Sequence, residues 1–144
     1  MSATTHELDK AQLLKDVSRS WDDDIVRQLH DYIEVPAKSP AFDTQWAQHG
    51  LLHRVLHNAA DWVRAQSVPG LQLEIIELPG RTPVLFFEVP ATRAAHEGSQ
   101  QTVLMYGHLD KQPEFNGWRS DLGPWSPQYL DGLLYGRGAA DDGY

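Results

Sequence analysis

The two residues best suited to catalysis or metal binding are His108 and Asp110. They follow an apolar run at 103–106 after a single glycine. Residues two apart in a strand point to the same face, so both side chains would face one side where the strand ends. A neutral imidazole is the commonest metal ligand, and a carboxylate can accept its other N–H and fix the ring. The pair therefore suits a metal ligand and its orienting partner. Read alone, it fits a loop histidine hydrogen-bonded to an aspartate more often.

A second candidate group ends in two adjacent carboxylates, Asp141 and Asp142, after small residues at positions 136, 138, 139 and 140. One carboxylate can bridge two cations roughly 3.5–4 Å apart with its two oxygens. The alternative is a glycine-rich turn followed by solvated acids. Gly136 and Gly138 also match part of a dinucleotide-binding motif, but Asp141 replaces its third glycine and would repel a pyrophosphate. Dinucleotide binding is therefore disfavoured.

Three further histidines recur every four residues, at His49, His53 and His57, and could share one helix face. Two histidines spaced in this way can bind zinc, but the glutamate that serves as general base in such motifs is missing. A solvated helix face is the favoured interpretation. Trp118 and Trp125 could line a pocket or cover the core, and the sequence does not decide between these two roles.

The elements that must position these residues begin with two helices, expected at 20–35 and 44–66. Ser20 is a plausible N-cap, and Pro36 should end the first helix. Apolar residues recur on one face of each helix. Leu52, Val55, Leu56, Ala59 and Val63 form the expected apolar stripe of the second helix.

Strands are expected after the helices. Alternating residues at 71–78 and 84–89 predict a hairpin, and the run at 102–106 predicts a strand buried on both faces. Asp131-Gly132 between apolar pairs is typical of a two-residue hairpin turn. The order of elements predicts an α/β class, with helices packed on a mixed sheet.

Composition narrows the possible functions of the 144 residues. A net charge of −8 makes nucleic acid an unlikely partner, and no apolar stretch is long enough to predict a membrane span. The chain has no cysteine, so any metal must be held by His, Asp or Glu. Together with a polar N-terminus that does not look like a secretory signal, this fits the cytoplasm.

Taken together, the segments GHLDKQPEFNGW, GPWSP and DGLLYGRGAADDG resemble the M20 family of metallopeptidases. That family includes carnosinase-like dipeptidases, glutamate carboxypeptidases and N-acyl amino acid deacylases. The resemblance is dense and in the right order over residues 102–143. It implies a catalytic centre with two zinc ions, or sometimes other divalent metals. His108 would bind one metal, Asp110 would hold that imidazole, and Asp141 would bridge both ions. A cis peptide is implied between Asp141 and Asp142.

The resemblance also implies that residues 1–144 are the N-terminal portion of a catalytic domain. The general base, the remaining metal ligands and a smaller dimerisation domain would lie outside this chain, and the parent could be a homodimer. The parent would hydrolyse an amide in a small peptide or an acylated amino acid, while this chain alone would be inactive. Pro113 and the aromatic spacing favour the dipeptidase branch over the deacylases. A binding or regulatory module that keeps the scaffold is the alternative.

Overall fold

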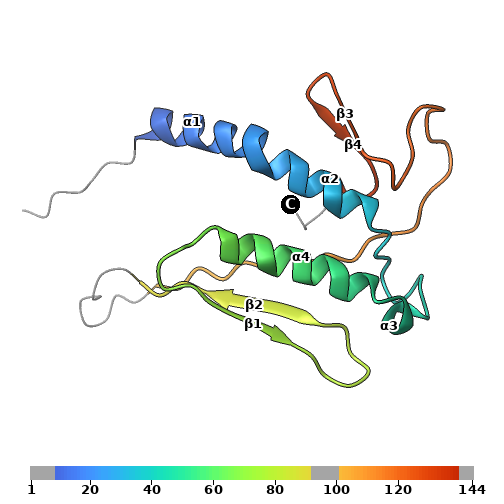
Figure 1. Ribbon diagram of the computed structural model, residues 1–144, viewed down its shortest axis with the longest axis horizontal. Coiled ribbons are helices and arrows are strands. Elements are labelled where there is room, and N and C mark those ends of the chain that lie inside the picture. Colours follow the sequence, from blue (N-terminus) through green and yellow to red (C-terminus); the bar gives the residue numbers. More distant parts are fainter. Residues whose placement is uncertain (1–8, 92–100, 140–144) are drawn as a thin grey trace, which may run out of the picture.

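The computed structural model describes residues 9–91 and 101–139. The chain opens with a long helix in three parts, which are α1 (Lys10–Ser20), a π-helical turn η1 (Trp21–Ile25) and α2 (Val26–Glu34). Figure 1 shows α2 running beside α4 (Leu51–Ala65), with a hairpin of two strands on the other side of α4. The helices and hairpins together confirm the α/β class.

The expected start of the first helix at Ser20 is wrong. The helix begins at Lys10, because the side chain of Asp9 accepts a hydrogen bond from the backbone N–H of Gln12 at 3.0 Å and caps it. The acidic run Asp22–Asp24 therefore lies inside the long helix, in the π-helical turn, and not at a helix N-terminus. The expected end is confirmed, since α2 stops at Glu34, two residues before Pro36.

The π-helical turn η1 has an explanation in the spacing of apolar residues. These recur every four residues over the whole helix, at Leu13, Val17, Trp21, Ile25, Leu29 and Ile33. In an α-helix, a step of four residues overshoots a full turn by about 40°, so such a stripe drifts around the helix. A π-helical turn takes in one extra residue and reverses part of that drift. Leu29 and Ile33 are buried, whereas Leu13 and Val17 in α1 are about half exposed.

The expected single helix at 44–66 is interrupted. A short helix α3 (Trp46–His49) ends at Gly50, whose φ of +67° is left-handed, and α4 starts immediately afterwards at Leu51. A left-handed residue ends an α-helix, and glycine adopts this conformation without steric cost. The apolar stripe is confirmed in the first half of α4, where Leu52, Val55 and Leu56 are buried. Leu52 and Val55 pack with Val35 and Ala37, which follow the end of α2, in one core cluster.

Both expected hairpins are present. β1 (Gln72–Ile76) pairs antiparallel with β2 (Val84–Glu88), with Leu73 opposite Phe87. β3 (Gln128–Leu130) pairs antiparallel with β4 (Leu133–Tyr135) through a two-residue turn. Asp131 and Gly132 both have positive φ there, 51° and 79°, as a type I′ turn requires.

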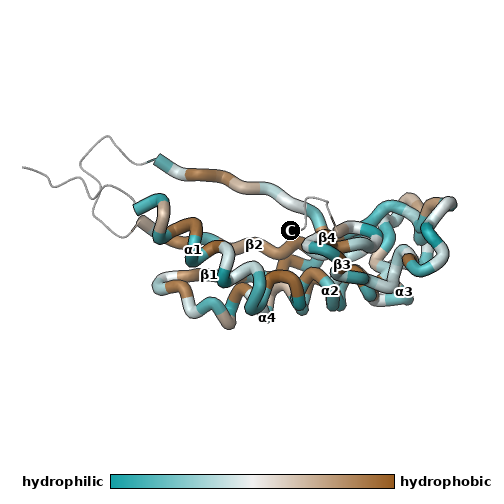
Figure 2. The backbone as a smooth tube through the Cα atoms, turned by 90° about the horizontal axis from the view of Figure 1, so that it is seen from above, coloured by the Kyte–Doolittle hydropathy of each residue, from teal (hydrophilic) through white to brown (hydrophobic). Residues whose placement is uncertain are grey.

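The strand expected at 102–106 does not form. Val103, Leu104, Met105 and Tyr106 are 85–90% exposed, and this run is the brown stretch of tube that lies apart from the helices in Figure 2. In the described part of the chain both two-stranded sheets are antiparallel, and of the two isolated bridges one, between Lys38 and Lys111, is parallel. The apolar composition predicted burial, but burial of a strand on both faces needs neighbouring elements that the described residues do not supply.

Among the described helices, none is both long enough and apolar enough to cross a membrane.

A hydrogen bond between helices gives a first prediction. The indole N–H of Trp62 in α4 donates to Asp24 at 2.7 Å, and this bond is the main cause of the lowered pKa of Asp24. A carboxyl whose pKa is lowered by folding stabilises the protein above its unfolded pKa, and this contribution is lost as pH falls through the folded value. Trp62→Phe should therefore lower the melting temperature by a few degrees at pH 7 and by less below pH 3.8. An equal loss at both pH values, measured by circular dichroism, would contradict this role for Asp24.

Candidate functional site

His108 and Asp110 lie together as the sequence predicts. Nδ1 of His108 is 3.2 Å from Oδ1 of Asp110 and 3.0 Å from the backbone carbonyl oxygen of the same residue. Both side chains are about one-third exposed, so the pair is reachable from solvent. Contacts at Nδ1 can fix the plane of the ring, and a metal would then bind through the other ring nitrogen, Nε2. The assigned roles of ligand and orienting partner stay predictions.

The segment that carries this pair is anchored to the end of α2. The backbone N–H of Lys111 donates to the carbonyl of Ala37 at 2.8 Å, and the N–H of Ser39 donates to the carbonyl of Lys111 at 2.9 Å. The hydroxyl of Tyr32 donates to the carbonyl of Leu109 at 3.1 Å. These bonds hold the backbone on both sides of Asp110 against the segment that follows α2.

The side chain of Lys111 is the most unexpected feature of this region, because it is only 1% exposed. Its ammonium donates to the backbone carbonyls of Tyr32 at 2.5 Å, Ile33 at 3.3 Å and Val35 at 2.7 Å. It also lies 3.9 Å from the centre of the Tyr32 ring. Burial lowers the pKa of Lys111 from 10.5 to about 7, while the carbonyls and the ring favour the charged form. Sequence reasoning missed Lys111, since no local pattern marks a lysine for burial.

The loop after β4 packs on the same end of α2. A Cβ on Gly136 would lie 2.4 Å from Cγ2 of Ile33, so only glycine fits there. The backbone N–H of Arg137 donates to the carbonyl of Pro124 at 2.7 Å, and its Nε donates to the carbonyl of Gln112 at 3.4 Å. The structure thus brings the segment that follows His108 and the glycine-rich loop together, although 25 residues separate Gln112 from Arg137.

The proposed bridging ligand, Asp141, lies outside the described residues, as does the peptide bond between Asp141 and Asp142 for which a cis form is expected. Within residues 9–91 and 101–139, no three His, Asp or Glu side chains are grouped so that they could hold a metal ion. His108 and Asp110 therefore account for one part of a metal site at most.

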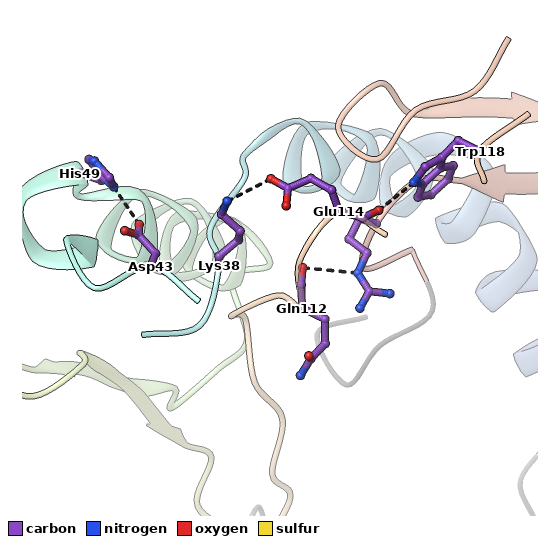
Figure 3. Close-up of polar contacts among 7 residues, drawn as sticks. Lys38, Asp43, His49, Gln112, Glu114 and Trp118 are labelled. Atoms are coloured by element: carbon purple, nitrogen blue, oxygen red, sulfur yellow. Dashed lines mark hydrogen bonds and ion pairs between the residues drawn. The ribbon is translucent and has the colours of Figure 1, made fainter. Parts of the chain in front are cut away.

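His49 and His53, two of the three histidines in the 49–57 series, make separate local contacts. Nδ1 of His49 lies 2.8 Å from Oδ2 of Asp43, as Figure 3 shows, and this hydrogen bond is the main cause of the lowered pKa of Asp43. His53 instead stacks on the ring of Trp46, with ring centres 6.1 Å apart. This arrangement gives no support to a shared zinc site on that helix face.

A cavity of about 460 Å³ lies beside the anchored segment. Its lining residues come from the α2–α4 connection, the start of α4 and the loop after Lys111, and are Pro36, Lys38, Asp43, His49, Leu51, Glu114 and Trp125. Nζ of Lys38 donates to Glu114 at 3.0 Å across it (Figure 3). The pKa of Glu114 is lowered by its own backbone N–H first and by Lys38 second. Trp125 therefore lines a pocket, whereas Trp118 donates its indole N–H to the carbonyl of Glu114.

Comparison with known proteins gives two kinds of relative. The chain is 36% identical over 83 residues to a succinyl-diaminopimelate desuccinylase of Anaplasma marginale. The aligned stretch covers 54% of this chain and 21% of that enzyme. It is 29% identical over 124 residues to the human Beta-Ala-His dipeptidase. That alignment covers 83% of this chain and 24% of that enzyme. A desuccinylase of Acinetobacter baylyi is 50% identical over 50 residues, 33% of this chain and 13% of that enzyme.

These relatives are M20 family enzymes, so the resemblance indicated by the motifs is confirmed over part of the chain. The chain spans about a quarter or less of the length of each of these relatives. No protein-family model matches the chain.

The close approach of Gly136 to α2 gives a second prediction. Gly136→Ala should destabilise the protein, because the new Cβ meets Ile33 at 2.4 Å and the φ of +152° disfavours a side chain. Overpacking of this kind typically costs about 1–3 kcal/mol. Gly117→Ala is the matched control, since Gly117 also has a positive φ, +87°, but has open space around it. Urea unfolding of both variants would isolate the steric part, and equal losses would contradict the contact.

Proposed function

We propose that this chain is the N-terminal part of an M20-family, metal-dependent hydrolase that cleaves an amide bond in a small peptide. One observation carries the proposal. His108 with Asp110 and the glycine-rich loop that leads to Asp141 are fixed on the same end of α2. The similarity to Beta-Ala-His dipeptidases over 83% of the chain supports a dipeptide as substrate.

The metal in this proposal is zinc, with two ions in the complete enzyme. The donor chemistry fits one end of such a site, because an imidazole with a carboxylate at 3.2 Å is a common zinc ligand arrangement. His108 and Asp141 are the proposed ligands. A catalytic zinc takes at least three protein ligands, so further ligands must come from residues other than those described. When bound, the metals supply Lewis acidity to the scissile carbonyl and lower the pKa of a water.

The residues of this chain then do two things. Asp110 holds the imidazole of His108 in one orientation, and the contacts at Lys111, Leu109 and Ala37 hold the backbone that carries both. Preorganisation of this kind matters, since a ligand that must be ordered on binding loses affinity for its metal. The general base of the reaction would come from outside the chain.

Two observations support the view that the working protein is longer. The chain spans about a quarter of the dipeptidases that it matches. The run Val103, Leu104, Met105 and Tyr106 is also almost fully exposed, and an apolar run of this kind favours coverage by additional strands. We propose that further residues of the same protein cover it and complete the metal site. We also propose a homodimeric, cytoplasmic parent that binds small substrates and not nucleic acid.

An N-acyl amino acid deacylase is the second candidate. It is favoured by the 50% identity with the Acinetobacter baylyi desuccinylase, which falls in a stretch of only 50 residues. Purified full-length protein should be offered β-alanyl-histidine and an N-succinyl amino acid in parallel. Faster turnover of the dipeptide supports the first candidate, and turnover of the succinyl compound alone supports the second.

The proposed metal ligands give a third prediction. In the full-length protein, His108→Ala and Asp141→Ala should each lower bound zinc and reduce amide hydrolysis by more than about 100-fold, because a lost ligand harms metal binding more than a lost orienting partner does. His57→Ala is the control, since His57 lies exposed on α4 and has no assigned role. Elemental analysis and turnover are the measurements. Normal zinc and activity in both variants would refute the assignment of His108 and Asp141 as ligands, whereas unsubstituted protein that holds no zinc and hydrolyses no amide would favour a binding module on the same scaffold.

The orienting carboxylate gives a fourth prediction. Asp110→Asn keeps the size of the side chain but removes the charge that steadies the imidazole at 3.2 Å. Most of the zinc should remain, while kcat should fall by about 10- to 100-fold. If kcat is unchanged at saturating zinc, Asp110 has no part in the site.

A further inference from the structure

Lys111 occupies a place where a charged side chain needs strong compensation. The last carbonyls of an α-helix have no partners within the helix, and they form the negative end of its dipole. The ammonium of Lys111 donates to the carbonyls of Tyr32, Ile33 and Val35, so its three N–H donors are matched by three acceptors. With 1% exposure and these bonds made, the side chain is unable to reach a substrate.

The backbone of Lys111 fixes the position of the predicted metal ligand. Lys111 forms a parallel bridge with Lys38 and comes directly after Asp110. Any movement of Lys111 relative to α2 therefore moves Asp110, and with it the carboxylate that lies 3.2 Å from His108.

The aliphatic part of the same side chain supports the glycine-rich loop. A Cβ on Gly138 would lie 3.2 Å from Cε of Lys111 and 3.4 Å from both Cδ and Cγ. The loop backbone at Gly138 thus rests on the lysine stem, three residues before Asp141 in the sequence. One buried side chain touches the end of α2 and this loop, while its own backbone carries the His108–Asp110 segment.

We propose that Lys111 is a positioning residue that sets the distance between the His108–Asp110 pair and the loop that leads to Asp141. The inference rests on the proposed function, because it assigns both segments to one metal site. Its specific content is that losing the ammonium separates the two halves of the site, in addition to removing a helix cap. A residue that only stabilised the fold would act on activity through unfolding alone.

The test uses full-length protein with Lys111→Met, which keeps an unbranched apolar stem but removes the ammonium. At saturating zinc and 25 °C, kcat for amide hydrolysis should fall about 10- to 100-fold, the range typical of residues that orient ligands. Zinc affinity should fall within the same range, and KM should change little. The readouts are turnover, zinc titration and a melting curve.

Two control variants separate positioning from stability. Val55→Ala removes methyl groups from the core beneath α2 at a side chain that is 3% exposed, and should lower the melting temperature. It should nevertheless keep kcat within about twofold while folded, which corresponds to less than about 0.5 kcal/mol in barrier height. Lys15→Met removes an exposed lysine of α1 that has no assigned role, and should leave zinc affinity unchanged.

A second variant keeps the proposal testable if Lys111→Met does not fold. Gly138→Ala pushes the lysine stem and the loop apart by a few tenths of an ångström and should weaken zinc binding. Gly132→Ala is its control, because Gly132 has a similar φ of +79° but no neighbour within 4 Å.

Folded Lys111→Met with normal kcat and zinc affinity would overturn the proposal. So would a Gly138→Ala variant that matches Gly132→Ala in zinc affinity. A His108→Ala variant with normal zinc and activity would instead overturn the metal site assigned under the proposed function, so the two failures are distinguishable.

Discussion

The carboxyl end of α2 is the point on which the described structure depends. Two carbonyls there accept backbone hydrogen bonds, that of Tyr32 from the N–H of Val35 at 3.2 Å and that of Val35 from the N–H of Ala37 at 2.8 Å. A single ammonium, on Lys111, adds a charged donor to both of these carbonyls and to that of Ile33. Because the donor comes from a distant part of the chain, the same bonds that end the helix also fix where the candidate site lies. The contacts that cap α2 are therefore also the contacts that set the geometry of the candidate site.

Local signals in the sequence predicted the parts of the fold that depend on local geometry. Pro36 ends α2 and Asp131-Gly132 forms the hairpin turn, because both act through the φ angles of one or two residues. The start of the long helix was misplaced, since Asp9 is as good a cap as Ser20 and competes with it. The left-handed Gly50 was missed because a glycine within a helical pattern can also continue a helix.

The candidate site was predictable where residues lie close in sequence and not where the fold brings them together. His108 and Asp110 are only two residues apart, so their side chains meet although the strand expected before them does not form. Lys111 gave no signal, because its burial depends on carbonyls more than 70 residues away. The exposed run at 103–106 shows the converse. Its apolar composition predicts a buried segment, but composition does not specify which strands would cover that segment.

The long separation between Lys111 and α2 constrains the order of folding. The bond from Lys111 to Tyr32 closes a loop of 79 residues, so its entropy cost must be met before the bond contributes any stability. On a ribosome, the residues of α2 emerge well before residue 111, so its final turn lacks the Lys111 donor until then. The helix end should fray during that interval and become ordered together with the candidate site. Contacts of such high sequence separation slow folding, so assembly of this region would be among the late events.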